Sequence, residues 1–386
     1  MTTMQTSAAN HAKRIASIDI LRGLVMLFML VDHVRERYFY HQQVGDPMDV
    51  DITSPQLFFT RMSAHFCAPV FVFLTGLSAW LYSHPANKPA RSATPFLFKR
   101  GLFIIFIEIA VINWLWMGTY DTLWLQVMWA IGVSMVVLSV LCHLPAKLIL
   151  ALGLLIVCGH NLLSPISFAP GETGYTLWAI LHDRGFIFTS EDFRIKASYP
   201  VLPWIGVILL GYSMGPVFSR NVASPQRKKV LLGLALSMWG VLLVLRGFNI
   251  YGEVMPWETQ ATAIQTAMDF INFTKYPPSL DFVLLTLGGA FLVLFALDTV
   301  NNKFTQVIES FGSAPMFFYI VHLFVLLVSY RIVLNLAGPN YGGLFAFDYV
   351  WQVWLVAALL AVVLYFPTKA FSRFKHNSTN PLVKYF

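Results

Sequence analysis

The chain has 386 residues, of which 57% are hydrophobic and only 12% are charged. Because soluble domains carry roughly 25% charged residues, this composition excludes an ordinary soluble globular protein. The formal net charge of +7 would suit a nucleic-acid partner, but the distribution of the charges along the chain indicates another cause.

Ten apolar segments are separated by charged or Pro/Gly-rich breaks, and most approach the length of about 20 residues that crosses a bilayer as a helix. In chain order they are residues 18–36, 66–83, 97–117, 122–142, 146–164, 200–218, 229–246, 280–298, 314–335 and 349–371. They predict an all-α, polytopic membrane bundle of about ten transmembrane helices. The expected organisation is a tail over residues 1–17, a transmembrane domain over 18–371 and a second tail over 372–386.

The lysines and arginines between these segments are divided unequally. If the N-terminus is cytoplasmic, sixteen fall on the inner side and seven on the outer side, as the positive-inside rule requires. We therefore expect both termini in the cytoplasm, membrane lipid around the chain and no nucleic-acid partner. Three outer connections are long, at residues 37–65, 165–199 and 247–279, so we expect specific recognition on the outer face.

The first segment, IDILRGLVMLFMLVDHVRER, carries Asp19, Arg22, Asp32 and His33. Ionisable residues inside a membrane segment are costly and mark functional sites. Arg22 and His33 are eleven residues apart, which places them about 20° apart on one helix face and about 16 Å apart along the axis. Asp19 can pair with Arg22 three residues later. Alternatively, Asp19 and Arg22 lie at the interface, and His33 simply marks the outer end of the helix.

Further ionisable residues lie in later segments. Arg61 and His65 are one helical turn apart at the outer end of the second segment, where they could converge with His33 or form an exposed pair. Glu108 and Asn113 suit structural pairing between helices. His322 lies inside the ninth segment and is either a buried structural residue or part of a polar pathway.

Motifs for other chemistries are missing from the sequence. It contains no P-loop and no dinucleotide fingerprint in a soluble unit, and no HExxH or close His/Cys pair. We therefore expect neither ATP hydrolysis nor nicotinamide chemistry, and no metal site.

Two stretches in the first segments, SIDILRGLVMLFMLVDH and TRMSAHFCAPVFVFLTG, resemble bacterial members of the heparan-α-glucosaminide N-acetyltransferase catalytic-domain family. The stretches YPVLPWIGVILLGYSMG at 199–215, NFTKYPPSLDFVLLTLG at 272–288 and FGSAPMFFYIVHLF at 311–324 strengthen this resemblance. The spacing of Arg22 and His33 is also similar to the Arg-x10-His signature of the acyltransferase type 3 family.

The resemblance implies ten or eleven helices around a central pore, acetyl-CoA or another acyl-CoA as donor from the cytoplasm, and a sugar acceptor across the membrane. His33 matches the signature His of the type 3 family, and Arg22 matches its Arg. The animal lysosomal enzyme has an Asn where His33 stands, and its catalytic His aligns with His41 only across a gap. The identity of the base therefore stays open.

These observations together predict a transmembrane O- or N-acyltransferase in the bacterial inner membrane, with a glycan acceptor on the outer face. We expect His33 to act as base, Asp32 or His65 to assist it, and Arg61 to stabilise the oxyanion. The expected donor-binding residues are Arg22, Lys99, Arg100 and His322. A transporter or flippase is the main alternative, and a purely structural membrane partner is a third. The oligomeric state stays open, a homo-oligomer included.

Overall fold

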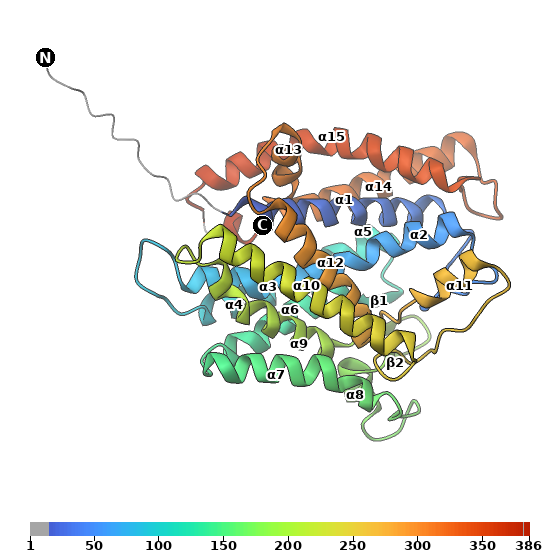
Figure 1. Cartoon of the computed structure of the whole chain (residues 1–386). Helices are drawn as coiled ribbons and strands as arrows, with labels where there is room; N and C mark the ends of the chain where they lie inside the picture. Colours follow the sequence, from blue (N-terminus) through green and yellow to red (C-terminus); the bar gives the residue numbers. More distant parts are fainter. Residues whose placement is uncertain (1–14, 381) are drawn as a thin grey trace, which may run out of the picture.

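The computed structural model describes residues 15–380 and 382–386, and these residues are mostly helical (Figure 1). The helices are α1 (Ala16–Tyr38), α2 (Pro55–Ser63), α3 (Cys67–Ser83), α4 (Thr94–Ile107), α5 (Asn113–Met117), α6 (Val127–Leu141), α7 (Ala146–Gly159), α8 (Tyr175–Leu181), α9 (Val201–Ser213), α10 (Ser224–Gly247), α11 (Ala263–Phe270), α12 (Leu280–Leu297), α13 (Lys303–Gly312), α14 (Pro315–Ala337) and α15 (Val350–Asn377). Short 3-10 turns occur at Ala64–Phe66, His160–Leu163, Gly215–Phe218 and Leu382–Tyr385, and a π-helical turn at Glu108–Ile112.

Helix starts follow local chemistry where the sequence provides it. Ser54 precedes α2, and its side chain accepts a hydrogen bond from the backbone of Leu57, while Pro55 occupies the first turn. Ser279 caps α12 in the same way through the backbone of Phe282. Such side chains satisfy backbone N–H groups that a helix leaves unpaired at its start.

Six stretches of the described residues are long and apolar enough to cross a membrane. They are Pro55–Ser83, Ala146–Leu163, Ser224–Gly247, Leu280–Leu297, Pro315–Ala337 and Val350–Asn377. Each of the ten predicted segments overlaps a helical stretch, whereas the number of ten crossings and the cytoplasmic termini stay predictions. Most of the predicted tail over 1–17 lies outside the described residues. The predicted end at residue 371 falls inside α15.

A small sheet interrupts the otherwise helical order. Strand β1 (Thr122–Leu125) pairs in parallel with β3 (Arg194–Ala197), and β3 pairs antiparallel with β2 (Gly185–Thr189). The prediction of a helix from residue 122 is therefore wrong at its start, and α6 begins at Val127. Asn113 favours the strand because its side chain bonds both the N–H and the carbonyl of Trp124.

Glu108 and Asn113 have the structural role that the sequence indicated. The Glu108 carboxylate accepts hydrogen bonds from the backbone N–H groups of Met128 (2.9 Å) and Trp129 (3.3 Å) at the start of α6. The pair thus ties the π-helical turn after α4 to α6 and to β1. This fixes the position of β1 beside the helices.

Small residues set the closest helix contacts. α3 packs against α9, and α1 packs against α13. A Cβ atom built on Gly76 of α3 would lie 2.0 Å from the carbonyl oxygen of Ile208 in α9, and one on Gly211 of α9 would lie 2.0 Å from that of Phe73. Side chains larger than hydrogen at these two positions would therefore push the helices apart.

We expect Gly76→Ala to destabilise the protein by about 1–3 kcal/mol, since the added methyl group meets backbone that has little room to shift. Thermal unfolding in detergent measures the effect. Gly240→Ala in α10 is the matched control, because no atom lies within 4 Å of the Cβ it would add. Equal unfolding temperatures for the two variants would contradict this account of α3–α9 packing.

Candidate active site

A cavity of about 660 Å³ lies at the C-terminal end of α1, and we call it the distal cavity. Its lining from α1 consists of Met29, Asp32, His33, Glu36 and Arg37. Each of the three long connections also contributes lining residues, represented by Asp46, Tyr199 and Lys275. The connections are joined to one another: Asn272 exchanges two hydrogen bonds with the backbone of Met48, and Tyr276 donates to the hydroxyl of Tyr199 at 3.0 Å.

His33 lines this cavity and is held by a second histidine. Its Nδ1 lies 2.7 Å from Nε2 of His322 on α14, and the two rings are stacked with centroids 5.0 Å apart. The Trp116 ring lies 4.8 Å away on a third element. His33 therefore faces the interior of the bundle, which removes the alternative of a histidine that only marks the end of a helix.

The hydrogen bonds of His322 determine which nitrogen of each neutral ring carries the proton. Nδ1 of His322 lies 2.8 Å from the carbonyl oxygen of Phe318, which can only accept. Nδ1 of His322 therefore donates, and its Nε2 accepts from Nδ1 of His33. Neutral His33 is left with a lone pair on Nε2, to which no described residue donates a hydrogen bond. A lone pair at a cavity wall is what a general base or nucleophile requires.

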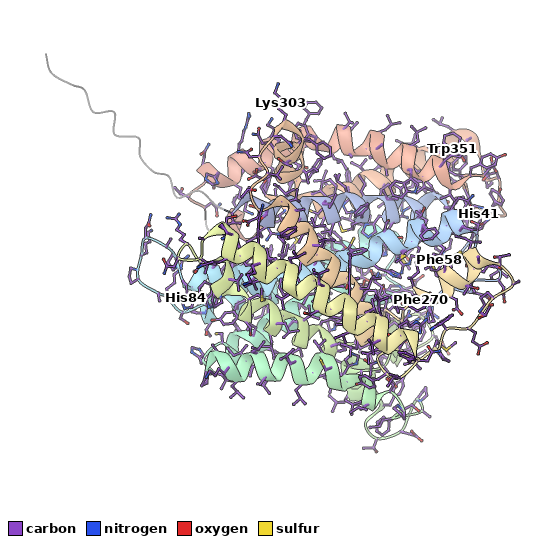
Figure 2. All side chains as sticks on the ribbon, in the orientation of Figure 1. His41, Phe58, His84, Phe270, Lys303 and Trp351 are labelled. Atoms are coloured by element: carbon purple, nitrogen blue, oxygen red, sulfur yellow. The ribbon has the colours of Figure 1, made fainter. Side chains whose placement is uncertain are left out.

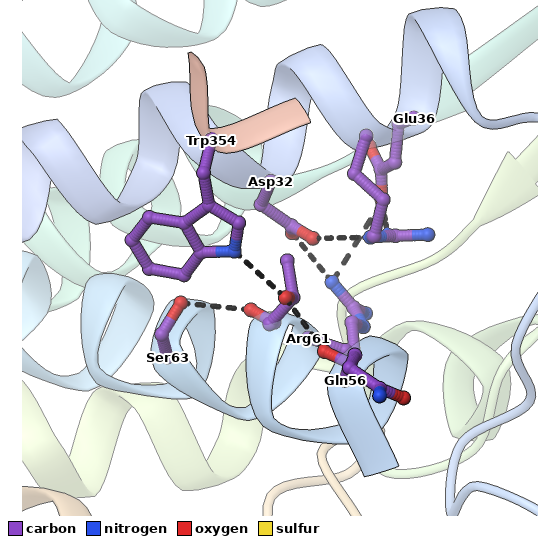
Figure 3. Close-up of polar contacts among 8 residues, drawn as sticks. Asp32, Glu36, Gln56, Arg61, Ser63 and Trp354 are labelled. Carbon is purple, nitrogen blue, oxygen red and sulfur yellow. Dashed lines mark hydrogen bonds and ion pairs between the residues drawn. The ribbon is translucent and has the colours of Figure 1, made fainter. Parts of the chain in front are cut away.

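Asp32 does not hold His33. Its carboxylate accepts from Arg35 (2.8 Å) and from Arg61 of α2 (2.6 Å), and Arg61 also lies 3.7 Å from Glu36 (Figure 3). Neighbouring residues on a helix project about 100° apart, so Asp32 points toward α2 while His33 points toward α14. Asp32 was predicted to orient His33. In the structure it instead belongs to an ion-pair network that joins α1 to α2.

His65 and His41 lie away from the cavity wall. His65 is buried in the turn between α2 and α3, with its ring 5.3 Å from that of Phe282. His41 stacks on Tyr341 with ring centroids 4.1 Å apart. Neither histidine is among the residues that line the distal cavity. His33, Asp32 and Arg61 therefore all line the distal cavity, whereas His65 does not.

A second cavity of about 650 Å³ lies at the N-terminal end of α1, and we call it the proximal cavity. Its lining includes Arg22, Ser78, Trp80, His84 and Arg220. Figure 2 shows His84 at the opposite end of the bundle from His41. The two cavities thus lie toward opposite ends of α1.

Arg22 is the one predicted donor-binding residue that lines the proximal cavity. It pairs with Asp19 as the i,i+3 spacing predicted, and it donates to the Gly312 carbonyl at 3.2 Å. Lys99 is exposed, and the Arg100 guanidinium lies 5.6 Å from the Phe96 ring. Neither lines this cavity. His322, also predicted to bind the donor, is fully buried beside His33.

Several polar residues of the two cavities were not singled out from the sequence. Lys275 is buried, lines the distal cavity and lies in the KYPP stretch that carries part of the resemblance. Asp46 accepts from the backbone of Lys275 at 3.2 Å, and burial raises the pKa of its carboxyl against the opposing charges of Arg61 and Lys275. Arg220 lines the proximal cavity. Loop residues of this kind have no periodicity that would reveal their position.

The fold and these two cavities define a helical protein with segments long and apolar enough to cross a membrane, and with a hydrogen-bonded histidine pair of which His322 is fully buried. A family model described as "Heparan-alpha-glucosaminide N-acetyltransferase, catalytic" matches residues 14–251, more than half of the chain. The chain therefore belongs to this N-acetyltransferase catalytic-domain family, which confirms the resemblance found in the sequence. Lys275 and His322 lie beyond the matched residues. No curated protein matches the chain.

We expect Asp32→Asn and Arg61→Met each to lower the free energy of unfolding by up to about 3 kcal/mol, because each removes the shortest ion pair of a buried network whose other pairs remain. Unfolding in mixed detergent micelles measures this, with the exposed Lys99→Met as control. The double variant should lose less than the sum of the two single losses. Strict additivity would contradict the direct Asp32–Arg61 interaction.

Proposed function

We propose that the protein is a membrane-embedded acyltransferase that moves an acetyl or other acyl group from acyl-CoA to a hydroxyl or amine of a sugar or glycan. The observation that carries this proposal is the histidine pair: His322 leaves the Nε2 lone pair of His33 free at the wall of the distal cavity. Membership of an N-acetyltransferase family supports the reaction class.

The distal cavity is the proposed acceptor site. Rings of Trp116, Trp124 and Tyr199 supply apolar walls, and Asp46 and Glu36 supply carboxylates that can accept hydrogen bonds from sugar hydroxyls. Small-molecule sites combine such aromatic walls with a few placed polar groups. A sugar ring with its hydroxyls fits this mixture better than an apolar ligand does.

The proposed reaction begins when Nε2 of His33 accepts the proton of the acceptor hydroxyl or amine. The acceptor atom forms a bond to the acyl carbonyl carbon, the C–S bond of the thioester breaks, and the imidazolium returns the proton to the CoA thiolate. His322 accepts a hydrogen bond from Nδ1 of His33 throughout, so the ring keeps its orientation. Transfer through an acyl group on Nε2 of His33 would use the same lone pair.

The proximal cavity is the proposed donor site. Arg22 and Arg220 offer guanidinium groups to the phosphates of CoA, and the stacked rings of Trp80 and His84 offer an aromatic surface. Arg22 and His33 lie about 16 Å apart along α1, and buried Met26 lies between them. Because methionine is unbranched and adaptable, its displacement is the proposed opening for the acyl arm.

The sidedness follows from the predicted orientation. With the N-terminus in the cytoplasm, the proximal cavity receives cytoplasmic acyl-CoA and the distal cavity receives an acceptor on the outer face. A bacterial inner membrane suits this arrangement, since acyl-CoA is present only on its inner side.

We expect His33→Ala to reduce label transfer from radiolabelled acetyl-CoA to glycans by a factor of about 10²–10⁴, the usual contribution of a general base. His322→Ala should also reduce transfer, because Nδ1 of His33 loses its acceptor. Purified protein in liposomes is assayed against a panel of glycans and acyl-CoAs. His376→Ala, at an exposed position near the end of α15, is the control and should transfer normally.

Absence of label on glycan and protein for every acyl-CoA tested would rule out the acyltransferase. Uptake of an unmodified solute by the same liposomes would favour the transporter or flippase instead. Label retained on the protein without acceptor, and lost in His33→Ala, would indicate the acyl-histidine route.

We expect Arg220→Ala to raise the KM for acyl-CoA about tenfold, as loss of one charge-assisted phosphate contact implies, with kcat unchanged. Steady-state kinetics at saturating acceptor measure it. Lys229→Ala, an exposed cation on the same predicted side, should leave KM unaltered. A change in the acceptor KM alone would contradict the placement of the donor in the proximal cavity.

A further inference from the structure

Lys275 is a buried cation that forms no ion pair with a described residue, although the Asp46 carboxyl is near enough for the two charges to interact. It is only 5% exposed and lines the distal cavity, and its ammonium forms no hydrogen bond or ion pair with any described residue. The ammonium lies 5.2 Å from the centroid of the Tyr276 ring. Burying a charge is costly unless it is paired, so this ammonium is suited to a negative charge that arrives with the reaction.

The backbone around Lys275 is held in place on both sides. The N–H of Lys275 donates to Asp46 at 3.2 Å, and that of the preceding Thr274 donates to Glu253 at 2.8 Å. Lys275 also pairs with Pro278 in an isolated β-bridge. A backbone held before the reaction limits the rearrangement that the Lys275 side chain needs to meet a transition state.

Tyr199 offers a second donor in the same cavity. Its hydroxyl accepts from Tyr276 at 3.0 Å, which leaves its own proton free to donate. Burial raises the pKa of Tyr199 well above its usual value, so the hydroxyl keeps this proton at neutral pH. Tyr199 and Lys275 come from two different long connections that meet at this wall.

Arg61, the cation expected from the sequence to stabilise the oxyanion, is already engaged. Its Nη1 lies 2.6 Å from Asp32 and 3.7 Å from Glu36. A guanidinium that neutralises a buried carboxylate has less charge to offer a new anion. Lys275 has no such competitor at hydrogen-bond distance among the described residues.

We propose that Lys275 and the hydroxyl of Tyr199 form the oxyanion-binding site of the distal cavity. This rests on the acyl transfer proposed above. When the acceptor atom bonds to the acyl carbon, the carbonyl electron pair moves to oxygen, and Lys275 and Tyr199 bind that oxygen. The electron pair returns as the carbonyl re-forms and the C–S bond breaks, with the proton passing from His33 to the CoA thiolate.

The test compares wild type with Lys275→Met, Lys275→Arg and Tyr199→Phe in the label-transfer assay, with neutral and acidic sugars as acceptors. We expect Lys275→Met to lower kcat by a factor of about 10²–10³ for every acceptor, as loss of one oxyanion donor does, with KM values nearly unchanged. Lys275→Arg should recover part of this loss. Tyr199→Phe should lower kcat by about tenfold.

Lys196→Met is the matched control, because this lysine lies over the Trp124 ring, 5.1 Å from its centroid, and is not among the residues that line the cavity. Acetyl-CoA binding by calorimetry shows that each variant is folded. If Lys275→Met does not fold, the kcat values of Lys275→Arg and Tyr199→Phe test the oxyanion site in its place.

Wild-type kcat in Lys275→Met would overturn the oxyanion site while the acyltransferase stands. A rise in KM confined to acidic acceptors would also overturn it and make Lys275 a binding group for the acceptor's own charge. Absence of transfer by the wild type would instead remove the proposed function itself.

Discussion

The hydrogen bond between His33 and His322 is the interaction on which the site depends. A backbone carbonyl of α14 can only accept, so it fixes the proton on Nδ1 of His322, and this in turn fixes the proton on Nδ1 of His33. Two helices far apart in the chain thereby determine which nitrogen of His33 keeps its lone pair. A carboxylate partner would also orient the His33 ring but would add a charge, whereas here the ring is oriented through a second imidazole and a backbone carbonyl.

The charges around this pair are arranged so that they do not compete with it. Asp32, the residue beside His33, pairs with Arg35 of the same helix and with Arg61, and the Asp32–Arg61 pair joins α1 to α2 (Figure 3). At the other end of α1, Arg22 pairs with Asp19 and donates a hydrogen bond to the carbonyl of Gly312 in α13. α1 therefore carries Arg22 toward one cavity and His33, the proposed base, toward the other. The long connections then complete the distal cavity, in which Lys275 forms no ion pair with any residue that the structure describes.

Local features were predictable from the sequence, and long-range ones were not. The Asp19–Arg22 pair follows from i,i+3 spacing, and the apolar segments located the helices. Short sequence stretches were enough to recognise the family, and the family model, which matches residues 14–251, confirms it. The partner of His33 lies 289 residues away, and helical periodicity contains no information about such a contact. Adjacency in the sequence favours Asp32 as the partner of His33, but adjacent helical residues point in different directions. The sequence predicts helix over strand β1 because the apolar residues of the strand continue almost directly into α6.

The most direct test of the account is the structure of the protein with a non-transferable thioether analogue of acetyl-CoA, determined by electron cryo-microscopy in lipid nanodiscs. The account predicts the nucleotide in the proximal cavity beside Arg22 and Arg220. It also predicts Met26 displaced and the acyl end beside Nε2 of His33 in the distal cavity. An analogue bound elsewhere, or with its acyl end remote from His33, would contradict the claim that this helix joins a donor site to an acceptor site.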